Sequence, residues 1–442
     1  MSATVHDARG IAGTALQHLK EGDGEVLVST DTSELTRFAE NAIHQNVAET
    51  SLQLRARVIA DRRVGVASVG GSDPDELARR VMTAAEEARR VSPPTEVSPL
   101  PDPDGGSDAP VAFSTATAQA TPELRADLVG SITQRAAVRG FKAYGFVSTA
   151  VRETAITSTR GIERSARSSQ ASAVVVVRGE AGSGYASRHA ADVASLDLAA
   201  MADEAVDTCA RNQDAEAIDP GTYEVVLAPY AVTDLLEHMA WVGLSALAVQ
   251  EHRSFMRVGE RLMSESVTVR DDCRDTALFP YPFDYEGVSS QPVDLIRNGV
   301  CSAVVYDTPT ALRDGVRSTG HSLPQPNTFG PYPSHLMMLP GERTVDELIA
   351  GVQRGLYITR FWYVRDVDPL RTIITGMTRD GTFLIEGGRV GRPVKDLRFT
   401  QGIVDALSDV RGISVERRLE LGEGESGVLS PWVALGHFAF TS

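Results

Sequence analysis

Residues 141–190 read FKAYGFVSTAVRETAITSTRGIERSARSSQASAVVVVRGEAGSGYASRHA, a long run of small and β-branched residues interrupted by glycine-containing corners. Such runs are typical of consecutive antiparallel strands joined by turns. Amphipathic helical patterns flank the run, at residues 121–139 before it and at residues 196–212 after it. The segment therefore predicts a strand meander enclosed by two helices.

The same order of elements occurs earlier in the chain. Residues 5–20 have the spacing of a helix, residues 25–69 contain strand patterns separated by polar corners, and residues 72–91 are helical again. Ser72 or Asp73 can cap the second helix, and Pro74 suits its first turn. We therefore expect an α+β domain over residues 1–215, with a duplicated helix–strand meander–helix pattern.

Two further boundaries follow from composition. Residues 92–110 are rich in Pro, Gly and Asp, which predicts an exposed linker. From residue 220 to residue 442 short β-rich segments dominate, so we expect a second, mostly antiparallel β domain. It should contain one long helix at 230–252 and a short helix capped by Thr344.

Charge and hydropathy narrow the class of protein. The 442 residues carry a formal net charge of -16, which disfavours nucleic acid and anionic membranes as partners. No apolar run reaches the ~18 residues of a membrane span, and the first twenty residues lack the apolar core of a signal peptide. The sequence thus predicts a cytoplasmic protein.

Generic catalytic motifs are missing from the sequence. It has no GxxxxGK[ST] loop, no GxGxxG after a strand and no HExxH. The nearest approach to a nucleophile elbow, at residues 243–247, falls inside the predicted helix, so Ser245 is expected to be a packed helix residue. Its three cysteines, Cys209, Cys273 and Cys301, are widely spaced and predict buried thiols.

Four segments nevertheless stand out, and they follow one another along nearly the whole chain. They are TRFAENAIHQNVAETSLQLRARV at 36–58, LLEHMAWVGL at 235–244, STGHSLPQPNTFGPYPSHLMMLPG at 318–341, and DGTFLIEGGRVGRPVKDLRFTQGIVDAL at 380–407. Together they resemble the TldD/TldE (PmbA) metallopeptidase family. That resemblance implies hydrolysis of peptide or amide bonds in unfolded peptides, modified peptides or small amide-linked metabolites.

Within that family, TldD-type subunits carry HExxxH in the helix that here contains LLEHMAWVGL. Two histidines at this spacing can share one zinc ion, and the glutamate can activate the bound water. Here Glu237 and His238 take the places of the first His and the Glu, and Val242 takes that of the second His. The family's third ligand is a Cys near a glycine-rich turn, which reads LELGEGESGVL here, at 419–429, without cysteine.

The resemblance therefore implies a TldE-type subunit that binds no metal or other cofactor itself. It would pair as a heterodimer with a zinc-bearing TldD-type partner. Arginine greatly outnumbers lysine in this chain, which is typical of a GC-rich genome. In such genomes these pairs can belong to natural-product biosynthesis, so intermediates of such pathways are among the expected substrates.

Two other hypotheses remain open. The chain could be an autonomous hydrolase with a site rebuilt from Asp234, Glu237 and His238, since Asp234 and His238 lie one helical turn apart. It could instead be a binding or assembly protein without catalytic function. His238 alone is more simply interpreted as a hydrogen-bonded histidine on a half-buried helix.

A candidate substrate cleft lies between two prolines, Pro333 and Pro340. The residues between them include Ser334, His335, Leu336, Met337 and Met338. Prolines at both ends favour an edge strand. In TldD-type relatives the matching strand lines the cleft and pairs with the substrate peptide by β-augmentation. In a TldE-type chain the same strand would shape the shared cavity, and a core strand is the alternative.

Overall fold

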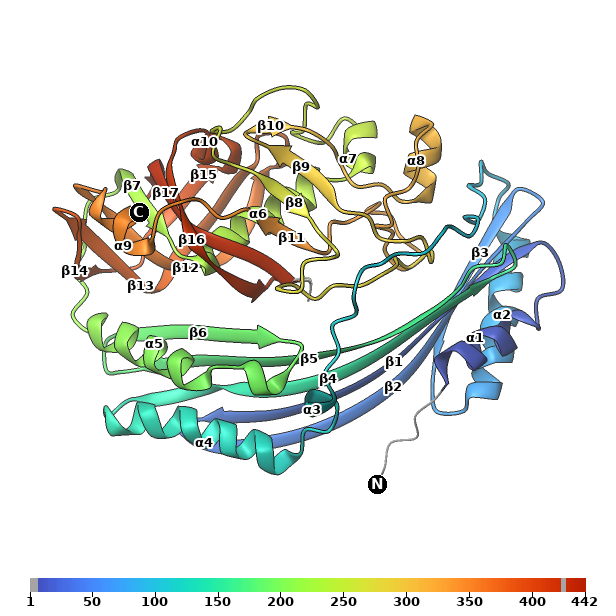
Figure 1. The fold of residues 1–442 in the computed structure, drawn as a ribbon, viewed down its shortest axis with the longest axis horizontal. Helices are drawn as coiled ribbons and strands as arrows, with labels where there is room; N and C mark the ends of the chain where they lie inside the picture. Colours follow the sequence, from blue (N-terminus) through green and yellow to red (C-terminus); the bar gives the residue numbers. More distant parts are fainter. Residues whose placement is uncertain (1–6, 423–426) are drawn as a thin grey trace.

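The computed structural model describes residues 7–422 and 427–442, which fold into two parts (Figure 1). The first part contains α1 (Ala8–Leu16), β1 (Asp23–Ala39), β2 (Ala42–Ala60), β3 (Arg63–Gly70), α2 (Pro74–Val91), α3 (Thr115–Ala118), α4 (Pro122–Val138), β4 (Lys142–Ser158), β5 (Glu163–Arg178), β6 (Ser183–Ala190), the 3-10 turn η1 (Val193–Ser195) and α5 (Leu198–Arg211).

Six of these strands form one antiparallel sheet in the order β3-β2-β1-β4-β5-β6. The two halves meet where β1 pairs with β4, with Val28 opposite Ala155. Each half is a three-stranded meander with a helix before and after it in the chain. This arrangement confirms the duplicated pattern that the sequence predicts.

The helices of each half pack beneath its own end of the sheet. α1 and α2 cover one end, where Leu54 and Val81 are fully buried, and α4 and α5 cover the other, where Ile132 and Met201 are fully buried. Figure 1 shows α1 and α2 at one end of the sheet and α4 and α5 at the other. The opposite, concave face of the sheet is therefore left to face the rest of the chain.

The second part contains β7 (Gly221–Leu227), α6 (Pro229–Gly243), α7 (Ala246–Gln250), β8 (Val269–Asp271), β9 (Val293–Arg297), β10 (Val300–Cys301), α8 (Thr308–Asp314), β11 (Leu336–Met338), α9 (Val345–Ala350), β12 (Arg354–Asp368), the 3-10 turn η2 (Pro369–Arg371), β13 (Ile373–Glu386), β14 (Arg389–Val394), β15 (Arg398–Gly402), α10 (Ile403–Ser408), β16 (Val410–Leu421) and β17 (Gly427–Phe440).

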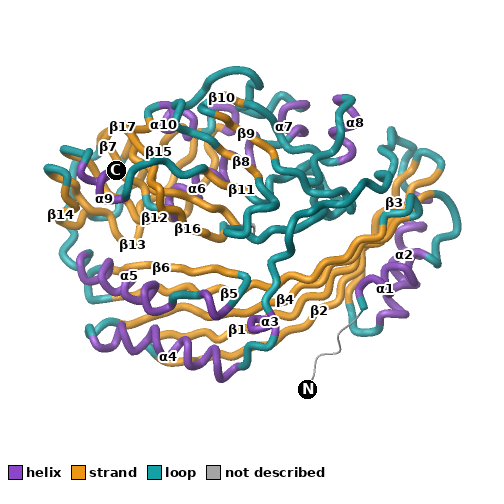
Figure 2. The backbone as a smooth tube through the Cα atoms, in the orientation of Figure 1, coloured by secondary structure: helices purple, strands orange, loops and turns teal. Residues whose placement is uncertain are grey.

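An eleven-stranded sheet and the helix α6 form the core of this second part. Most strand pairs are antiparallel, and β11–β17 and β12–β7 are parallel. Leu235, Leu236 and Met239 of α6 pack into the core with strand residues such as Leu356 and Phe438. Figure 2 shows long loops beside this sheet, around β8 and β11. The chain is thus an α+β protein, as predicted.

The expected long helix at 230–252 is interrupted. α6 ends at Gly243 and α7 begins at Ala246, where the Ser245 hydroxyl accepts a hydrogen bond from the Ala248 amide. The sequence interpretation missed this because Ser245 lies in a stretch with continuous helical periodicity, and the cap forms only when the chain turns there. By contrast, Thr344 caps α9 in a reciprocal capping box, as predicted.

The segment at 92–110 contains no helix or strand, but it is only partly exposed. Leu100 and Ala109 are buried, and Asp104 accepts hydrogen bonds from both the amide and the hydroxyl of Ser289. The expectation of a uniformly exposed linker was therefore too simple. The segment packs against the second part of the chain because Asp104 accepts hydrogen bonds from Ser289 and Asp108 pairs with Arg274.

Two clusters of ion pairs and hydrogen bonds, called the polar seams below, join the two parts at opposite ends of the concave sheet. At one end, buried Arg57 of β2 pairs with Glu25 at 2.7 Å and with Glu286 of the second part at 3.1 Å. At the other, Arg418 of β16 pairs with Glu204 of α5 at 2.7 Å and donates to the Tyr230 hydroxyl. The seams fix the spacing between the two parts.

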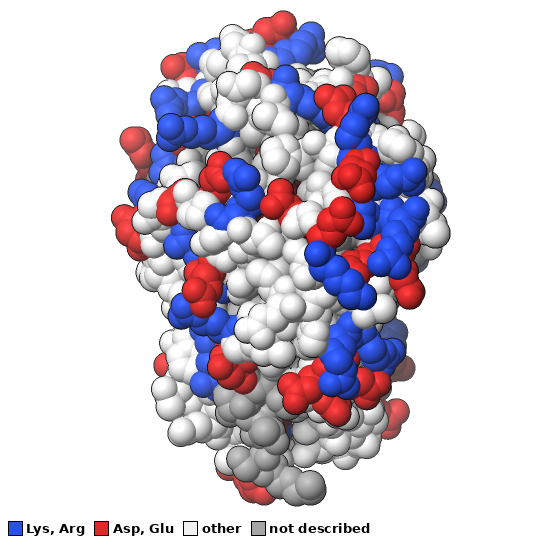
Figure 3. All heavy atoms as spheres, turned by 90° about the vertical axis from the view of Figure 1, so that its right-hand side faces the viewer, with Lys and Arg blue, Asp and Glu red and all other residues white. Residues whose placement is uncertain are grey.

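One end of the molecule carries charges of both signs. Figure 3 shows Lys and Arg interspersed with Asp and Glu on that face, around an uncharged strip. No helix among the described residues is both long and apolar enough to cross a bilayer.

Candidate active-site cavity

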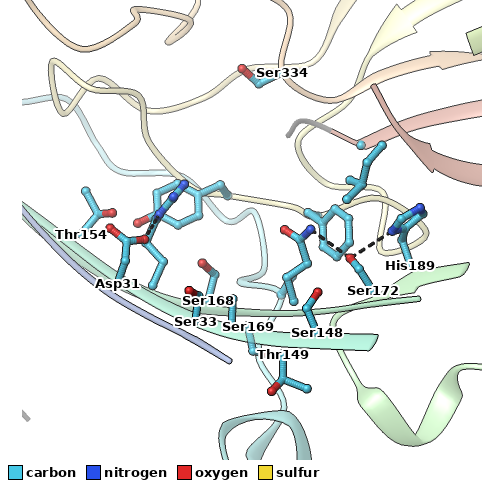
Figure 4. A pocket seen from close by; sticks show the side chains of 18 of the residues that line it. Asp31, Ser33, Ser148, Thr149, Thr154, Ser168, Ser169, Ser172, His189 and Ser334 are labelled. Atoms are coloured by element: carbon cyan, nitrogen blue, oxygen red, sulfur yellow. Dashed lines mark hydrogen bonds and ion pairs between the residues drawn. The ribbon is translucent and has the colours of Figure 1, made fainter. Parts of the chain in front are cut away.

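A cavity of about 950 Å³ lies between the concave sheet face and the second part of the chain (Figure 4). Its floor comes from β1, β4 and β5, and its far wall comes from loops of the second part. The polar floor includes Asp31, Ser33, Ser148, Thr154, Ser168, Gln170 and Ser172. The aromatic residues of the wall are Phe279, Tyr281, Phe283 and Tyr285. A hydroxyl-rich floor opposite an aromatic wall suits a ligand with both polar and apolar groups.

A histidine and a serine are hydrogen-bonded at one end of this floor. Ser172 of β5 lies opposite His189 of β6 in the strand register, and Ser172 Oγ is 3.0 Å from His189 Nδ1. Burial, with a contribution from the charge of Arg188, lowers the pKa of His189 to about 4. His189 is therefore a neutral imidazole at physiological pH.

A buried carboxyl group lies behind His189. Glu420 Oε2 is 3.9 Å from His189 Nε2 and accepts a hydrogen bond from the Ser187 hydroxyl. Burial raises the pKa of Glu420 to about 8, against the opposing effects of Ser187 and Arg418. Glu420 Oε1 has no hydrogen-bond partner among the described residues. The sequence search missed this row because residues 172, 189 and 420 share no local motif.

Two histidines and an aspartate form a second cluster in the far wall. His321 Nε2 is 3.0 Å from Asp271 Oδ1, and the His335 amide donates to Asp271 Oδ2 at 2.7 Å. Burial alone would raise the pKa of Asp271, but the two histidines hold it well below its ordinary value. The buried Asp271 thereby orients the imidazole of His321 and holds the backbone of His335, and both histidines line the cavity.

The five predicted cleft residues fall into two groups. Ser334 and His335 line the cavity. Leu336, Met337 and Met338 form β11 and are buried. β11 pairs with β8 on one side and with β17 on the other, so the edge-strand expectation was wrong. The prolines at 333 and 340 lie outside the paired residues and therefore do not disturb this interior strand.

The three helix positions that the resemblance marks have different surroundings on α6. Glu237 is buried against the glycine turn, where a Cβ built on Gly422 would fall 1.4 Å from Glu237 Oε1. His238 Nδ1 is 2.9 Å from Asp366 Oδ1, with its side chain 18% exposed. Val242 is buried in the apolar core.

These contacts confirm that His238 is a hydrogen-bonded histidine, but its helix is almost entirely buried and not half-buried as expected. Burial opposes its charged form, yet the hydrogen bond and charge of Asp366 raise its pKa. Asp234 adds only a weaker electrostatic contribution to that rise. Residues 423–426 of the glycine-rich turn lie outside the described residues. Among the residues that are described, no group of three His, Cys, Asp or Glu is arranged to hold a metal.

Comparison with known proteins supplies the family. The profile of the PmbA/TldA metallopeptidase C-terminal domain matches residues 220–442, which is half of the chain. A metalloprotease of Methanothermobacter thermautotrophicus is 29% identical over 180 residues, covering 40% of this chain and 38% of that protein. A metalloprotease TldD homolog of Haemophilus influenzae is 28% identical over 241 residues, covering 53% and 50%. The matched stretches thus span half or less of these relatives' own lengths.

Solved structures share the whole fold. TldE from Thermococcus kodakarensis superposes with a TM-score of 0.89 at 17% identity, covering 98% of this chain and 99% of that one. A putative modulator of a DNA gyrase from Thermotoga maritima gives 0.81 at 18% identity, covering 95% and 96%. At such identities the likeness shows the fold alone. With the family profile, the sequence matches and the shared two-part architecture, the chain belongs to the TldD/TldE (PmbA) metallopeptidase family.

Proposed function

We propose that this chain is the TldE-type, zinc-free subunit of a cytoplasmic TldD/TldE metallopeptidase complex. Its zinc-bearing TldD-type partner hydrolyses peptide or amide bonds in unfolded or modified peptides or in natural-product intermediates. Without the partner, this chain has no metallopeptidase activity.

The observation that carries the proposal is the set of contacts at the former motif positions of α6. Zinc in a peptidase needs three protein ligands that converge on one point, usually His, Glu or Cys. Val242 has no ligand atom and is buried in the apolar core, so His238 lacks a second ligand one turn along the helix. Glu237 packs against Gly422, in the segment where the family resemblance implies the third ligand. No cysteine follows Cys301 in the sequence. These residues do not fit a zinc ion.

The cavity supports a role in holding substrate. Its volume of about 950 Å³ lies at the upper end of the range of ligand pockets. Ser334 and His335 contribute to its wall, next to the orienting Asp271. Hydroxyl groups and aromatic rings together can accept the main chain and side chains of a short peptide. A partner docked at this cavity would supply the metal.

The rebuilt-site alternative finds less support. For a hydrolytic site, Asp234, Glu237 and His238 would have to converge on one reacting atom. Instead, Glu237 is buried at Gly422, while His238 lies partly exposed and bonds to Asp366 on β12. The two neighbouring side chains therefore point to different places.

Reconstitution with a TldD-type subunit tests the proposal. We expect a stable complex with an interface above ~1,000 Å². Substituting the glutamate of the partner's HExxxH motif should abolish amide hydrolysis, whereas a Glu237→Ala/His238→Ala variant of this chain should slow it far less. The chain would be the catalytic subunit if that double variant abolished turnover while pairing survived. It would be an assembly protein if the partner hydrolysed equally well without it.

A further inference from the structure

Ser172, His189 and Glu420 form a row at one end of the cavity, and none of the three is a motif position of α6. Ser172 Oγ lies 3.0 Å from His189 Nδ1, and His189 Nε2 lies 3.9 Å from Glu420 Oε2. Figure 4 shows the Ser172 and His189 side chains pointing toward each other across β5 and β6. A hydroxyl, an imidazole and a carboxyl group in this order are the parts that hydrolases use to activate a serine.

We propose that this row is a metal-independent acyl-transfer site, with Ser172 as nucleophile and His189 as general base. Ser172 Oγ bonds to the carbonyl carbon of an ester while its proton moves to His189 Nδ1. The tetrahedral adduct then expels the alcohol, which takes that proton from His189. Water, deprotonated by His189, attacks the acyl-Ser172 ester, and His189 returns that proton to Ser172 Oγ as the carboxylic acid leaves. No oxidant or metal is needed to balance these steps.

The hydrogen-bond directions agree with these roles. Gln170 Nε2 donates to Ser172 Oγ at 3.3 Å, which leaves the serine proton free to point at His189. With the serine proton in this bond, His189 accepts at Nδ1 and carries its own hydrogen on Nε2, toward Glu420. Its low pKa, caused by burial and by Arg188, keeps Nδ1 unprotonated at neutral pH.

The surroundings of Ser172 indicate the kind of substrate. Phe146 of β4 and Val174 of β5 lie opposite each other, next to the Ser148–Ser172 pair on the same face of the sheet. Both line the cavity together with Leu421. This apolar corner can take a short aliphatic acyl group. An ester of a small apolar acid is therefore the substrate class that fits, with its alcohol group in the wider part of the cavity.

Glu420 acts through His189 and is a positioning residue. Glu420 Oε2 lies 3.9 Å from His189 Nε2 and stabilises the transient imidazolium electrostatically. This stabilisation increases as the carboxyl group ionises. Because burial raises the pKa of Glu420 to about 8, the rate should rise as the pH passes that value. The titratable and charged groups that face this carboxyl group are Arg188, His189 and Tyr185 of β6, Glu204 of α5, Tyr230 of α6 and Arg418 of β16.

The test measures hydrolysis of p-nitrophenyl butyrate by the full chain without partner and with EDTA present. We expect turnover that falls at least about 100-fold in Ser172→Ala and in His189→Gln. A fluorophosphonate probe should add one mass increment to the natural chain, at Ser172. Glu420→Gln should lower the rate less and remove its rise near pH 8.

Ser165→Ala is the matched control, because Ser165 lies on the same strand β5 but is exposed and is not one of the residues that line the cavity. It should leave the rate unchanged, and thermal unfolding should show both serine variants folded. Equal activity of Ser172→Ala and the natural chain, or a probe attached elsewhere, would overturn the proposal. Neither result bears on the zinc-dependent complex, whose amide hydrolysis is lost with EDTA and with the partner's glutamate.

Discussion

The carboxylate of Glu237 lies directly against the backbone of Gly422, and a Cβ at position 422 would fall 1.4 Å from Glu237 Oε1. Helix α6 thus meets the residue that follows β16 at a glycine, the one residue type that leaves room for a carboxylate there. Each of the two residues constrains what the other can be.

Replacing Gly422 by alanine should therefore destabilise the fold by about 1–3 kcal/mol, the usual cost of forcing extra atoms into a packed site. Chemical denaturation measures this change. Combining it with Glu237→Ala should recover most of the loss, because the two residues are in contact and their effects are not additive. Gly105→Ala is the control, since a Cβ there meets nothing within 4 Å. Additive losses in the double variant would show that the contact is not the cause.

The purified chain should hold no stoichiometric zinc after dialysis. The reason is chemical, because Val242 offers no ligand atom beside His238 and no cysteine follows Cys301 in the sequence. Elemental analysis by mass spectrometry measures the metal content, with a zinc-bearing TldD-type subunit prepared in parallel. One tightly held zinc ion per chain would contradict the assignment as a zinc-free subunit.

The His238–Asp366 pair should make stability depend on pH. The folded-state pKa of His238 is raised above its ordinary value of 6.5, despite burial, by the hydrogen bond and charge of Asp366. Its stabilisation is therefore complete below the unfolded pKa and is lost as the pH rises through the folded pKa. Asp366→Asn should remove this dependence and lower the His238 pKa, as followed by NMR titration. An unchanged His238 titration would mean that the pair does not form in solution.

Arg57 should be essential for the junction between the two parts. It is buried between Glu25 and Glu286, and its removal leaves two carboxyl groups without their counter-ion. Arg57→Ala should cost about 3–5 kcal/mol in the free energy of unfolding. Arg80→Ala removes an exposed pair with Glu76 and should cost less than about 1 kcal/mol. Similar losses in both variants would contradict the role of Arg57 as a clamp.

Local patterns in the sequence sufficed for the element types and their order. The duplicated meander was predictable because the alternation of side chains along each strand depends on neighbouring residues in the sequence. The cap of α9 was predictable for the same reason. The same holds for His238, whose place on a helix follows from helical periodicity alone. Its partner Asp366, 128 residues away, was not predictable.

Tertiary pairing determined the features that the sequence interpretation got wrong or missed. β11 became an interior strand because β8 and β17 dock on either side of it, and proline positions at its ends carry no information about those neighbours. The helix predicted at 230–252 is divided because the Ser245 hydroxyl accepts a hydrogen bond from the Ala248 amide and caps a new helix there.

The candidate acyl-transfer row shows most clearly the difference between what the sequence determined and what only the tertiary structure decided. The sequence by itself determined that Ser172 and His189 lie in strands of one meander. The strand register then placed them opposite each other, and the packing of β16 onto β6 brought Glu420 to within 3.9 Å of His189. Strand partners and docked parts are selected by the burial and hydrogen bonding of the whole chain, so residues 172, 189 and 420 could be brought together only by the folded structure.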